Sequence, residues 1–131
     1  MNEAKKVKCQ GGCHCKSVRY EVQIPVQITA RKCNCSICAM TGFVHVTVDR
    51  EDLKLLSGKD ELREYRFNTG TAKHLFCRHC GVKSFYVPRS HPDGYSINLN
   101  CLDVGPEIQI RTEHFDGLHW RKNVHKIRDE T

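Results

Sequence analysis

The stretch Phe76-Cys77-Arg78-His79-Cys80-Gly81 places two thiols three residues apart and follows them with a glycine. This C-x-x-C-G pattern is typical of a zinc knuckle, because glycine permits the left-handed backbone that directs nearby N–H groups toward sulfur. Two further clusters lie earlier in the chain: Cys13-His14-Cys15 and Cys33-Asn34-Cys35-Ser36-Ile37-Cys38. Seven of the nine cysteines therefore fall into three clusters, which offer two, three and two sulfurs.

The number of sulfurs predicts two metal sites of different kinds. A closed structural zinc takes four ligands, whereas a catalytic zinc takes three from the protein and leaves one position open. We therefore expect a closed site that joins the first cluster to the third, and an open site within the middle cluster. The closed site would use Cys13, Cys15, Cys77 and Cys80, and the open site Cys33, Cys35 and Cys38.

Spacing alone leaves alternatives open. In one, both zincs are structural, because the middle cluster gains a fourth ligand from Cys9, His45, His79 or Cys101. A multi-iron cluster is less favoured, since the sequence has no ferredoxin-type run of cysteines. Disulfides are disfavoured by the odd cysteine count and by the reducing, intracellular compartment that the sequence predicts. We find no signal peptide and no apolar run long enough to span a membrane, which predicts an intracellular protein, cytoplasmic or nuclear.

Between the clusters, apolar and polar residues alternate with a period of two, which predicts β-strands. The clearest case is the segment in which Val18, Tyr20 and Val22 alternate with Arg19 and Glu21. Similar stretches follow at 28–30, 43–48, 82–87, 97–99 and 108–110. Two more, at 53–56 and 61–67, are expected to pair around the turn at 57–60.

Helix is expected only as a single turn at 49–52, capped by Asp49, and as a short segment within 118–128. The sequence thus predicts one mainly β domain with mostly antiparallel sheets. It would span residues 9–120, after an N-terminal tail at 1–8 and before a basic tail or short helix at 121–131.

The chain is basic, with a formal net charge of +6 and a pI near 8.9. Its lysines and arginines are spread along the sequence, so a solvated basic surface is favoured over a dedicated polyanion site. The same field would attract a small anionic substrate. Two hypotheses follow: an enzyme, or a non-catalytic zinc-stapled module that docks on nucleic acid or an acidic protein tail.

Three of the motifs together resemble the glutathione-dependent formaldehyde-activating enzyme family: residues 11–15, 33–38 and 76–81. Three further stretches are similar to its animal branch, the centromere protein V group: residues 67–69, 81–86 and 101–103. The resemblance extends from about Gly11 to Trp120. Its animal branch implies chromosome and cytoskeleton roles, and so a nucleic-acid or cytoskeletal partner, as the alternative to catalysis. One departure is that Ala39 and Met40 follow Cys38, where many members have arginine or lysine.

The resemblance implies a β-tent fold, in which coiled antiparallel sheets are clamped by zinc. It implies two zinc ions per chain, with Cys13, Cys15, Cys77 and Cys80 as structural ligands and Cys33, Cys35 and Cys38 as ligands of a catalytic zinc. The fourth position would receive the thiol of glutathione, and the activity would be carbon–sulfur lyase chemistry.

The chemistry of such a site agrees with that activity. Zinc with three thiolates carries a formal charge of −1, so it is a weak Lewis acid, yet a thiol that it coordinates loses its proton. The metal would therefore hold a nucleophile and would not activate water. The carboxylates of glutathione would find cations in Arg31, Lys32 or Arg78.

Other residues of these types receive simpler interpretations. His14 and His79 lie inside cysteine pairs, where flanking side chains usually point away from the ion. His45 is interpreted as an ordinary strand residue. Cys9 and Cys101 are interpreted as free thiols. For Trp120 and Tyr95, packing in the core is favoured over a place in a pocket.

Overall fold

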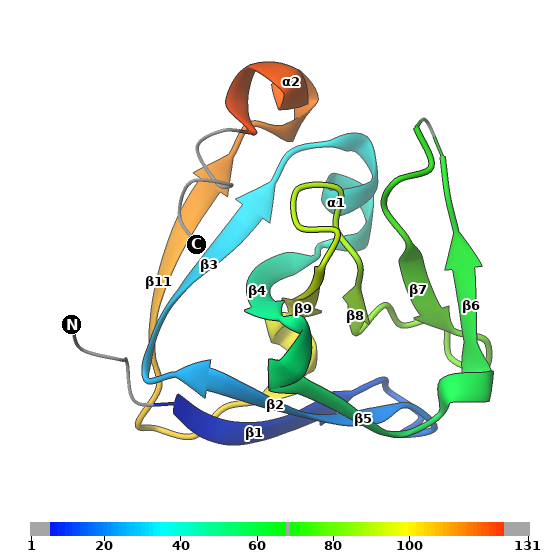
Figure 1. Cartoon of the computed structure of the whole chain (residues 1–131), viewed down its shortest axis with the longest axis vertical. Coiled ribbons are helices and arrows are strands. Elements are labelled where there is room, and N and C mark those ends of the chain that lie inside the picture. The colour runs from blue at the N-terminus through cyan, green and yellow to red at the C-terminus, as the bar shows by residue number, and fades with distance from the viewer. Residues whose placement is uncertain (1–5, 68, 125–131) are drawn as a thin grey trace.

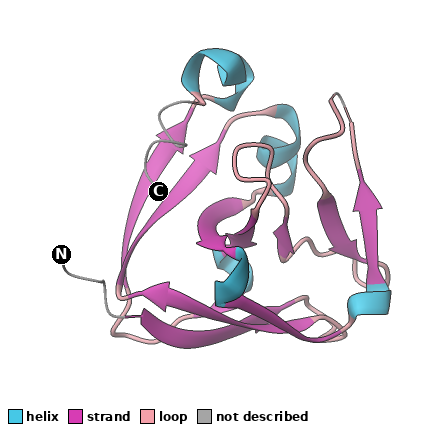
Figure 2. Cartoon of the chain, viewed as in Figure 1, coloured by secondary structure: helices cyan, strands magenta, loops and turns pink. Residues whose placement is uncertain are grey.

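The computed structural model describes residues 6–67 and 69–124 of the chain. Strands dominate this part and the helices are short (Figure 2). The strands are β1 (Lys6–Gly12), β2 (Arg19–Pro25), β3 (Gln27–Cys33), β4 (Val44–Asp49), β5 (Leu53–Ser57), β6 (Leu62–Tyr65), β7 (His74–Cys77), β8 (Phe85–Tyr86), β9 (Gly94–Asn98), β10 (Leu102–Asp103) and β11 (Gln109–Phe115). The helices are α1 (Ser36–Thr41) and α2 (Trp120–Asn123), and the 3₁₀ turns are η1 (Arg50–Asp52), η2 (Lys59–Glu61), η3 (Leu99–Cys101) and η4 (Gly117–His119).

The strands form three open sheets, and no closed barrel is found in the described part of the chain. One sheet has the order β10-β1-β2-β5, a second has the order β11-β3-β4-β9-β8, and β6 pairs with β7. The four-stranded sheet lies along the base in Figure 1, and the other strands rise from it. The prediction of a mainly β domain is confirmed.

The core lies between these sheets and follows from the alternation in β2. Tyr20, Val22 and Ile24 are fully buried, whereas the residues between them are partly or fully exposed. They belong to one apolar cluster with Val46 of β4 and Ile97 of β9. Burial of each such aliphatic side chain stabilises the fold by about 1.5–3 kcal/mol, so the sheets are held together mainly by this face.

The predicted pairing of 53–56 with 61–67 is wrong. Both segments contain strands, but β5 pairs with β2, and β6 pairs with β7. Residues 53–56 do not pair with residues 61–67 because both ends of the turn between them are hydrogen-bonded to other segments. The Ser57 hydroxyl donates to the Ser17 carbonyl at 3.2 Å, and the Glu61 carbonyl accepts from the Arg78 N–H at 2.8 Å.

Nearly all strand pairs are antiparallel, as predicted, but β3 and β11 are parallel. The turn at 49–52 is found as η1, although the Asp49 side chain makes no capping hydrogen bond. Strand β1 begins at Lys6 and so includes part of the predicted tail.

At the other end of the chain, the helix predicted within 118–128 is found in part, as η4 and α2, and α2 ends at Asn123. Residues 125–128 of that prediction, and 125–131 of the predicted tail, lie outside the described residues. No helix in the described ranges is long and apolar enough to cross a membrane. The β-tent assignment and the domain boundaries stay predictions.

Candidate metal centres and the adjoining pocket

Four thiols come together where the β1–β2 turn meets the segment after β7. The sulfur atoms of Cys13, Cys15, Cys77 and Cys80 all lie within 4.8 Å of one another. The Cys15 sulfur is 3.6 Å from that of Cys13 and 3.7 Å from that of Cys77. Tetrahedral zinc with Zn–S bonds of about 2.3 Å requires sulfurs about 3.8 Å apart. The four thiols therefore fit a closed zinc site.

The backbone around this group already donates to its sulfurs. The N–H of Val18 points at the Cys13 sulfur at 3.3 Å, and the N–H of His79 points at the Cys77 sulfur at 3.4 Å. Gly81 has a φ of 75°, the left-handed conformation that the C-x-x-C-G pattern predicts. Backbone N–H groups that point at sulfur stabilise the thiolate form. Cys13 and Cys77 are therefore placed to bind a cation as thiolates.

The other three clustered thiols lie where β3 passes into α1. The sulfur atoms of Cys33, Cys35 and Cys38 also lie within 4.8 Å of one another. Helix α1, which the sequence analysis did not predict, places the third thiol beside the first two. It begins with a hydrogen bond from the Ala39 N–H to the Cys35 carbonyl and ends at Gly42, whose φ is 67°.

The C-terminal part of the described chain holds this loop in place. Strand β11 runs parallel to β3, so that Phe115 pairs with Cys33. The Asn34 side chain donates to the Asp116 carboxylate at 3.1 Å and accepts from the Leu118 N–H at 3.0 Å. A Cβ atom at Gly117 would overlap the Cys33 sulfur, so this position requires glycine.

The three thiols perturb one another strongly. Contacts with Cys33 and Cys38 lower the pKa of Cys35 to about 2, and contacts with Cys33 and Cys35 raise the pKa of Cys38 far above its usual value. The group therefore favours one thiolate and opposes further ionisation. A divalent cation would remove this opposition, since thiolates are the form that binds metal. Two zinc sites thus fit the chain, one with four thiols and one with three.

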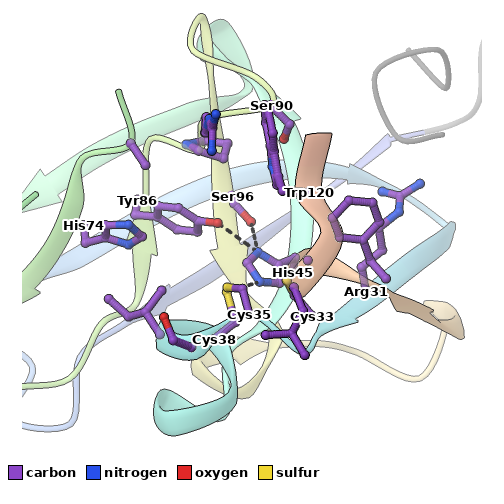
Figure 3. Close-up of a pocket in the computed structure, with 18 of the residues that line it drawn as sticks. Arg31, Cys33, Cys35, Cys38, His45, His74, Tyr86, Ser90, Ser96 and Trp120 are labelled. Carbon is purple, nitrogen blue, oxygen red and sulfur yellow. Dashed lines mark hydrogen bonds between the residues drawn. The ribbon is translucent and has the colours of Figure 1, made fainter. Parts of the chain in front are cut away.

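His45 of β4 contacts the three-thiol group (Figure 3). Its Nε2 lies 3.2 Å from the Cys38 sulfur, and its Nδ1 lies 3.0 Å from the Ser96 hydroxyl and 3.3 Å from that of Tyr86. Burial lowers the pKa of His45 to about 3, so the ring is neutral. In the tautomer that accepts a hydroxyl proton at Nδ1, the ring donates its Nε2–H to a thiolate at Cys38. His45 lies in a strand, as predicted, but its contact with Cys38 and its place beside the three thiols were not predicted.

Within the described residues, no further Cys, His, Asp or Glu joins the three sulfurs with all ligand atoms within 4.8 Å. Of the three sulfurs, His45 contacts that of Cys38. Cys9 is buried in the main core, His79 contacts the Glu61 carboxylate, and Cys101 lies in η3.

The three thiols and His45 lie in the wall of a pocket of about 620 Å³. Aromatic rings from four segments form much of the remaining wall: Phe67, His74, Tyr86 and Trp120. Four cationic side chains also line it, and none of the described lining residues is acidic: Arg31, Arg89, Arg121 and Lys122. The pocket therefore offers an apolar interior and a positive potential to an anionic ligand.

Some expectations about this region need correction. Trp120 is half-buried and lines the pocket, and the guanidinium of Arg89 lies 3.6 Å from its ring centre. Tyr95 packs on the core, with its ring 5.6 Å from that of Phe85. Of the cations proposed for the glutathione carboxylates, Arg31 lines the pocket and forms an ion pair with Glu113 at 3.7 Å. Arg78 forms an ion pair with Glu61 at 2.6 Å. Lys32 is not among the lining residues.

Several pocket residues carried no signal in the sequence. His74, Tyr86, Arg89 and Ser96 come from separate strands and loops, and none stands in a metal-ligand pattern. The pairing of β4 with β9 and of β9 with β8 brings Ser96 and Tyr86 to the thiols, and a bridge between Lys73 and Val87 sets His74 beside them. Local spacing does not reveal these contacts.

Fold and site together define a mainly β domain with two thiol clusters suited to zinc, one of which opens into a cationic pocket. The profile of a family described as glutathione-dependent formaldehyde-activating enzyme matches residues 8–117. The chain therefore belongs to this family. The structure is also similar to the crystal structure of a Rhodobacter sphaeroides protein, a structural genomics target, with 35% sequence identity and a TM-score of 0.67. The match covers 79% of this chain and 99% of that one.

Proposed function

We propose that this protein is a zinc-dependent carbon–sulfur lyase that acts on glutathione adducts of formaldehyde or a related small aldehyde. The observation that carries the proposal is the three-thiol group, which lies in the wall of a cationic pocket and lacks a fourth ligand among the described residues. Membership of the formaldehyde-activating family supports the choice of glutathione and formaldehyde.

The two thiol groups take different roles in this proposal. Cys13, Cys15, Cys77 and Cys80 would hold a structural zinc, and Cys33, Cys35 and Cys38 a catalytic one. When bound by three thiolates, zinc supplies acidification of an incoming thiol and a fixed position for the resulting thiolate. His45 would orient Cys38 through its N–H and keep that sulfur in the thiolate form.

The remaining pocket residues would bind the rest of the substrate. Glutathione carries two carboxylates, and guanidinium groups bind carboxylates through paired hydrogen bonds. Arg89 and Arg121 line the pocket and form no ion pair with any described residue. The aromatic wall would exclude water from the reacting carbon and so strengthen the electrostatic interactions inside.

The decisive test is whether the zinc-loaded protein accelerates exchange between free formaldehyde and its glutathione adduct, measured by exchange spectroscopy with isotope-labelled formaldehyde. We expect acceleration by the wild type and by Cys101→Ser, whose thiol belongs to neither group, and none by Cys35→Ser. Equal exchange with Cys35→Ser and wild type would contradict the role of the three-thiol group.

A second test addresses where glutathione binds. Titration of the isotope-labelled protein with glutathione should shift or broaden NMR signals of residues 33–45. Shifts confined to other regions would remove glutathione from the proposal.

The alternative of a non-catalytic module that docks on nucleic acid or acidic protein tails rests on the net charge of +6 and on the resemblance to the centromere protein V group. It would show as binding that weakens steeply with salt. The special closeness to the centromere protein V group and the intracellular location also stay predictions.

A further inference from the structure

A buried lysine lies behind the pocket wall. Lys83 precedes β8 and is only 9% exposed, and its Nζ lies 2.6 Å from Nδ1 of His74. The same ammonium lies 3.9 Å from the ring centre of Tyr86 and 4.9 Å from that of Phe43. No carboxylate within the described residues forms an ion pair with it. Buried charges are normally paired, so a lysine in this position needs an explanation.

His74 connects this lysine to the pocket. Its ring is stacked between Tyr86, at 4.9 Å between centres, and Phe67, at 5.4 Å, so its orientation is fixed. His74 lines the pocket, and its Nε2 has no hydrogen-bond partner among the described residues. Among the described residues, every fully buried side-chain nitrogen or oxygen has a hydrogen-bond partner. Because Nε2 has no such partner, it is not fully buried. It faces the pocket that His74 lines.

The lysine decides which nitrogen of His74 carries the proton. An ammonium group only donates hydrogen bonds, so Nδ1 must accept from Lys83. Burial and the Lys83 charge lower the pKa of His74 to about 4, and the ring is therefore neutral with its single proton on Nε2. An N–H donor is thus presented to the pocket.

The other ionisable groups around the lysine favour its charged form. The thiols of Cys33, Cys35 and Cys38 attract the ammonium from the β3–α1 side, and His45 and Tyr86 add neutral rings from β4 and β8. Burial opposes the charge and wins, so the pKa of Lys83 falls to about 8. Both the ammonium and the amine are therefore populated near neutral pH, unlike for an ordinary surface lysine with a pKa of about 10.4.

We propose that Lys83 and His74 form a proton relay that serves the oxygen of the aldehyde-derived carbon. The relay rests on the proposed lyase function and adds to it the acid and base that the cysteines do not supply. His74 would contact the substrate oxygen through Nε2, and Lys83 would act through His74 as a positioning and proton-storing residue.

The step balances without any further reagent. In adduct formation, the thiolate electron pair forms the C–S bond and the C=O π pair moves to oxygen. The oxygen takes the Nε2 proton of His74, Nδ1 takes a proton from the Lys83 ammonium, and Lys83 is left as the neutral amine. Breakdown reverses each transfer: Nε2 accepts the hydroxyl proton, Nδ1 returns a proton to the amine, the C–S bond breaks and the aldehyde leaves.

The first test reads the position of the proton directly. In the zinc-loaded full chain with isotope-labelled histidine, long-range nitrogen–proton NMR distinguishes the two tautomers of His74, assigned by the loss of its signals in His74→Gln. We expect Nε2–H well below pH 8 and a change to Nδ1–H as the pH rises through the Lys83 pKa of about 8. Lys83→Met should abolish the change, whereas Lys73→Met, at an exposed lysine next to His74, should keep it. A tautomer that ignores pH in the wild type would overturn the relay.

The second test uses the formaldehyde–glutathione exchange assay. His74→Phe keeps the aromatic stack but has no proton to transfer, and we expect exchange to slow by about a hundredfold or more, with zinc content and glutathione affinity unchanged. Lys83→Arg keeps a donor to Nδ1 but retains its proton, so it should be slow and should lose the pH step near 8. A full rate in His74→Phe would overturn the relay alone. Absence of exchange in the wild type would overturn the lyase function, and with it the relay.

Discussion

Replacement of Cys77 should destabilise the protein much more than replacement of Cys35. Cys77 joins the end of β7 to the β1–β2 turn, and its contact with Cys15 spans 62 residues of chain. Cys35 belongs to a group that spans only six residues, from Cys33 to Cys38. The two zinc sites therefore constrain the unfolded chain very differently.

The loop lengths give the size of the difference. Treated as a simple cross-link, closure of the 62-residue loop restricts the unfolded chain by about 4 kcal/mol, whereas closure within the middle cluster does so by about 2 kcal/mol. Each kcal/mol corresponds to about 3–4 °C in Tm for a domain of this size. We therefore expect Cys77→Ser to lower Tm by about 14 °C and Cys35→Ser by about 7 °C.

Circular dichroism melting of the zinc-loaded variants measures this difference, and native mass spectrometry counts the zinc. Each variant should retain about one zinc ion. Cys101→Ser serves as the matched control, because its thiol belongs to neither group, and it should retain two. Equal losses of Tm in the two ligand variants, or a larger loss in Cys35→Ser, would refute the assignment of the four-thiol group as the structural staple.

Four further predictions concern the pocket and its surroundings. Gly117→Ala places a Cβ where the Cys33 sulfur lies, so chelator competition should show weaker zinc binding at the three-thiol group only; unchanged affinity would contradict the packing. His45→Ala removes the N–H that points at Cys38 and should weaken the same zinc site by about 10–100-fold, measured in the same way. Arg89→Ala removes a lining cation and should weaken glutathione binding by about fivefold in calorimetry, with zinc content unchanged; a larger effect at high salt than at low salt would argue against an electrostatic role. Burial lowers the pKa of Lys83 from 10.5 to about 8, so the folded state binds fewer protons than the unfolded chain between these values and wild-type stability rises with pH across that window. Lys83→Met should remove this rise and be more stable than wild type at neutral pH by up to about 3 kcal/mol in urea unfolding; parallel pH profiles would contradict the buried charge.

The sequence predicted the fold class well because strand alternation is a local property. The buried face of β2 follows directly from the period of two around Tyr20, and this face forms the core. The pairing of strands was harder to predict from the sequence. The turn at Gly58 looked like a hairpin, but its neighbours bond to Ser17 and Arg78, which are distant in sequence.

The candidate site was predicted only in part, because sequence patterns reveal local groups of residues and not distant contacts. Thiol clusters are visible in a sequence because metal ligands share a short stretch of backbone. The pocket wall is assembled from residues on β4, β7, β8 and β9, and the role of Lys83 depends on one contact with His74 across the wall. A lone lysine and a lone histidine carry no pattern, so only the tertiary structure connects them.

The parallel pairing of β3 with β11 has a consequence for synthesis of the chain. Cys33 is placed beside Phe115, and the adjoining glycine at 117 packs on its sulfur. During translation, β3 therefore has no neighbour on this edge until residue 115 has left the ribosome. Until then, the loop that carries the three thiols lacks the contacts of Phe115 and Gly117 with Cys33. The three-thiol centre thus takes its final geometry only after β11 has docked on β3.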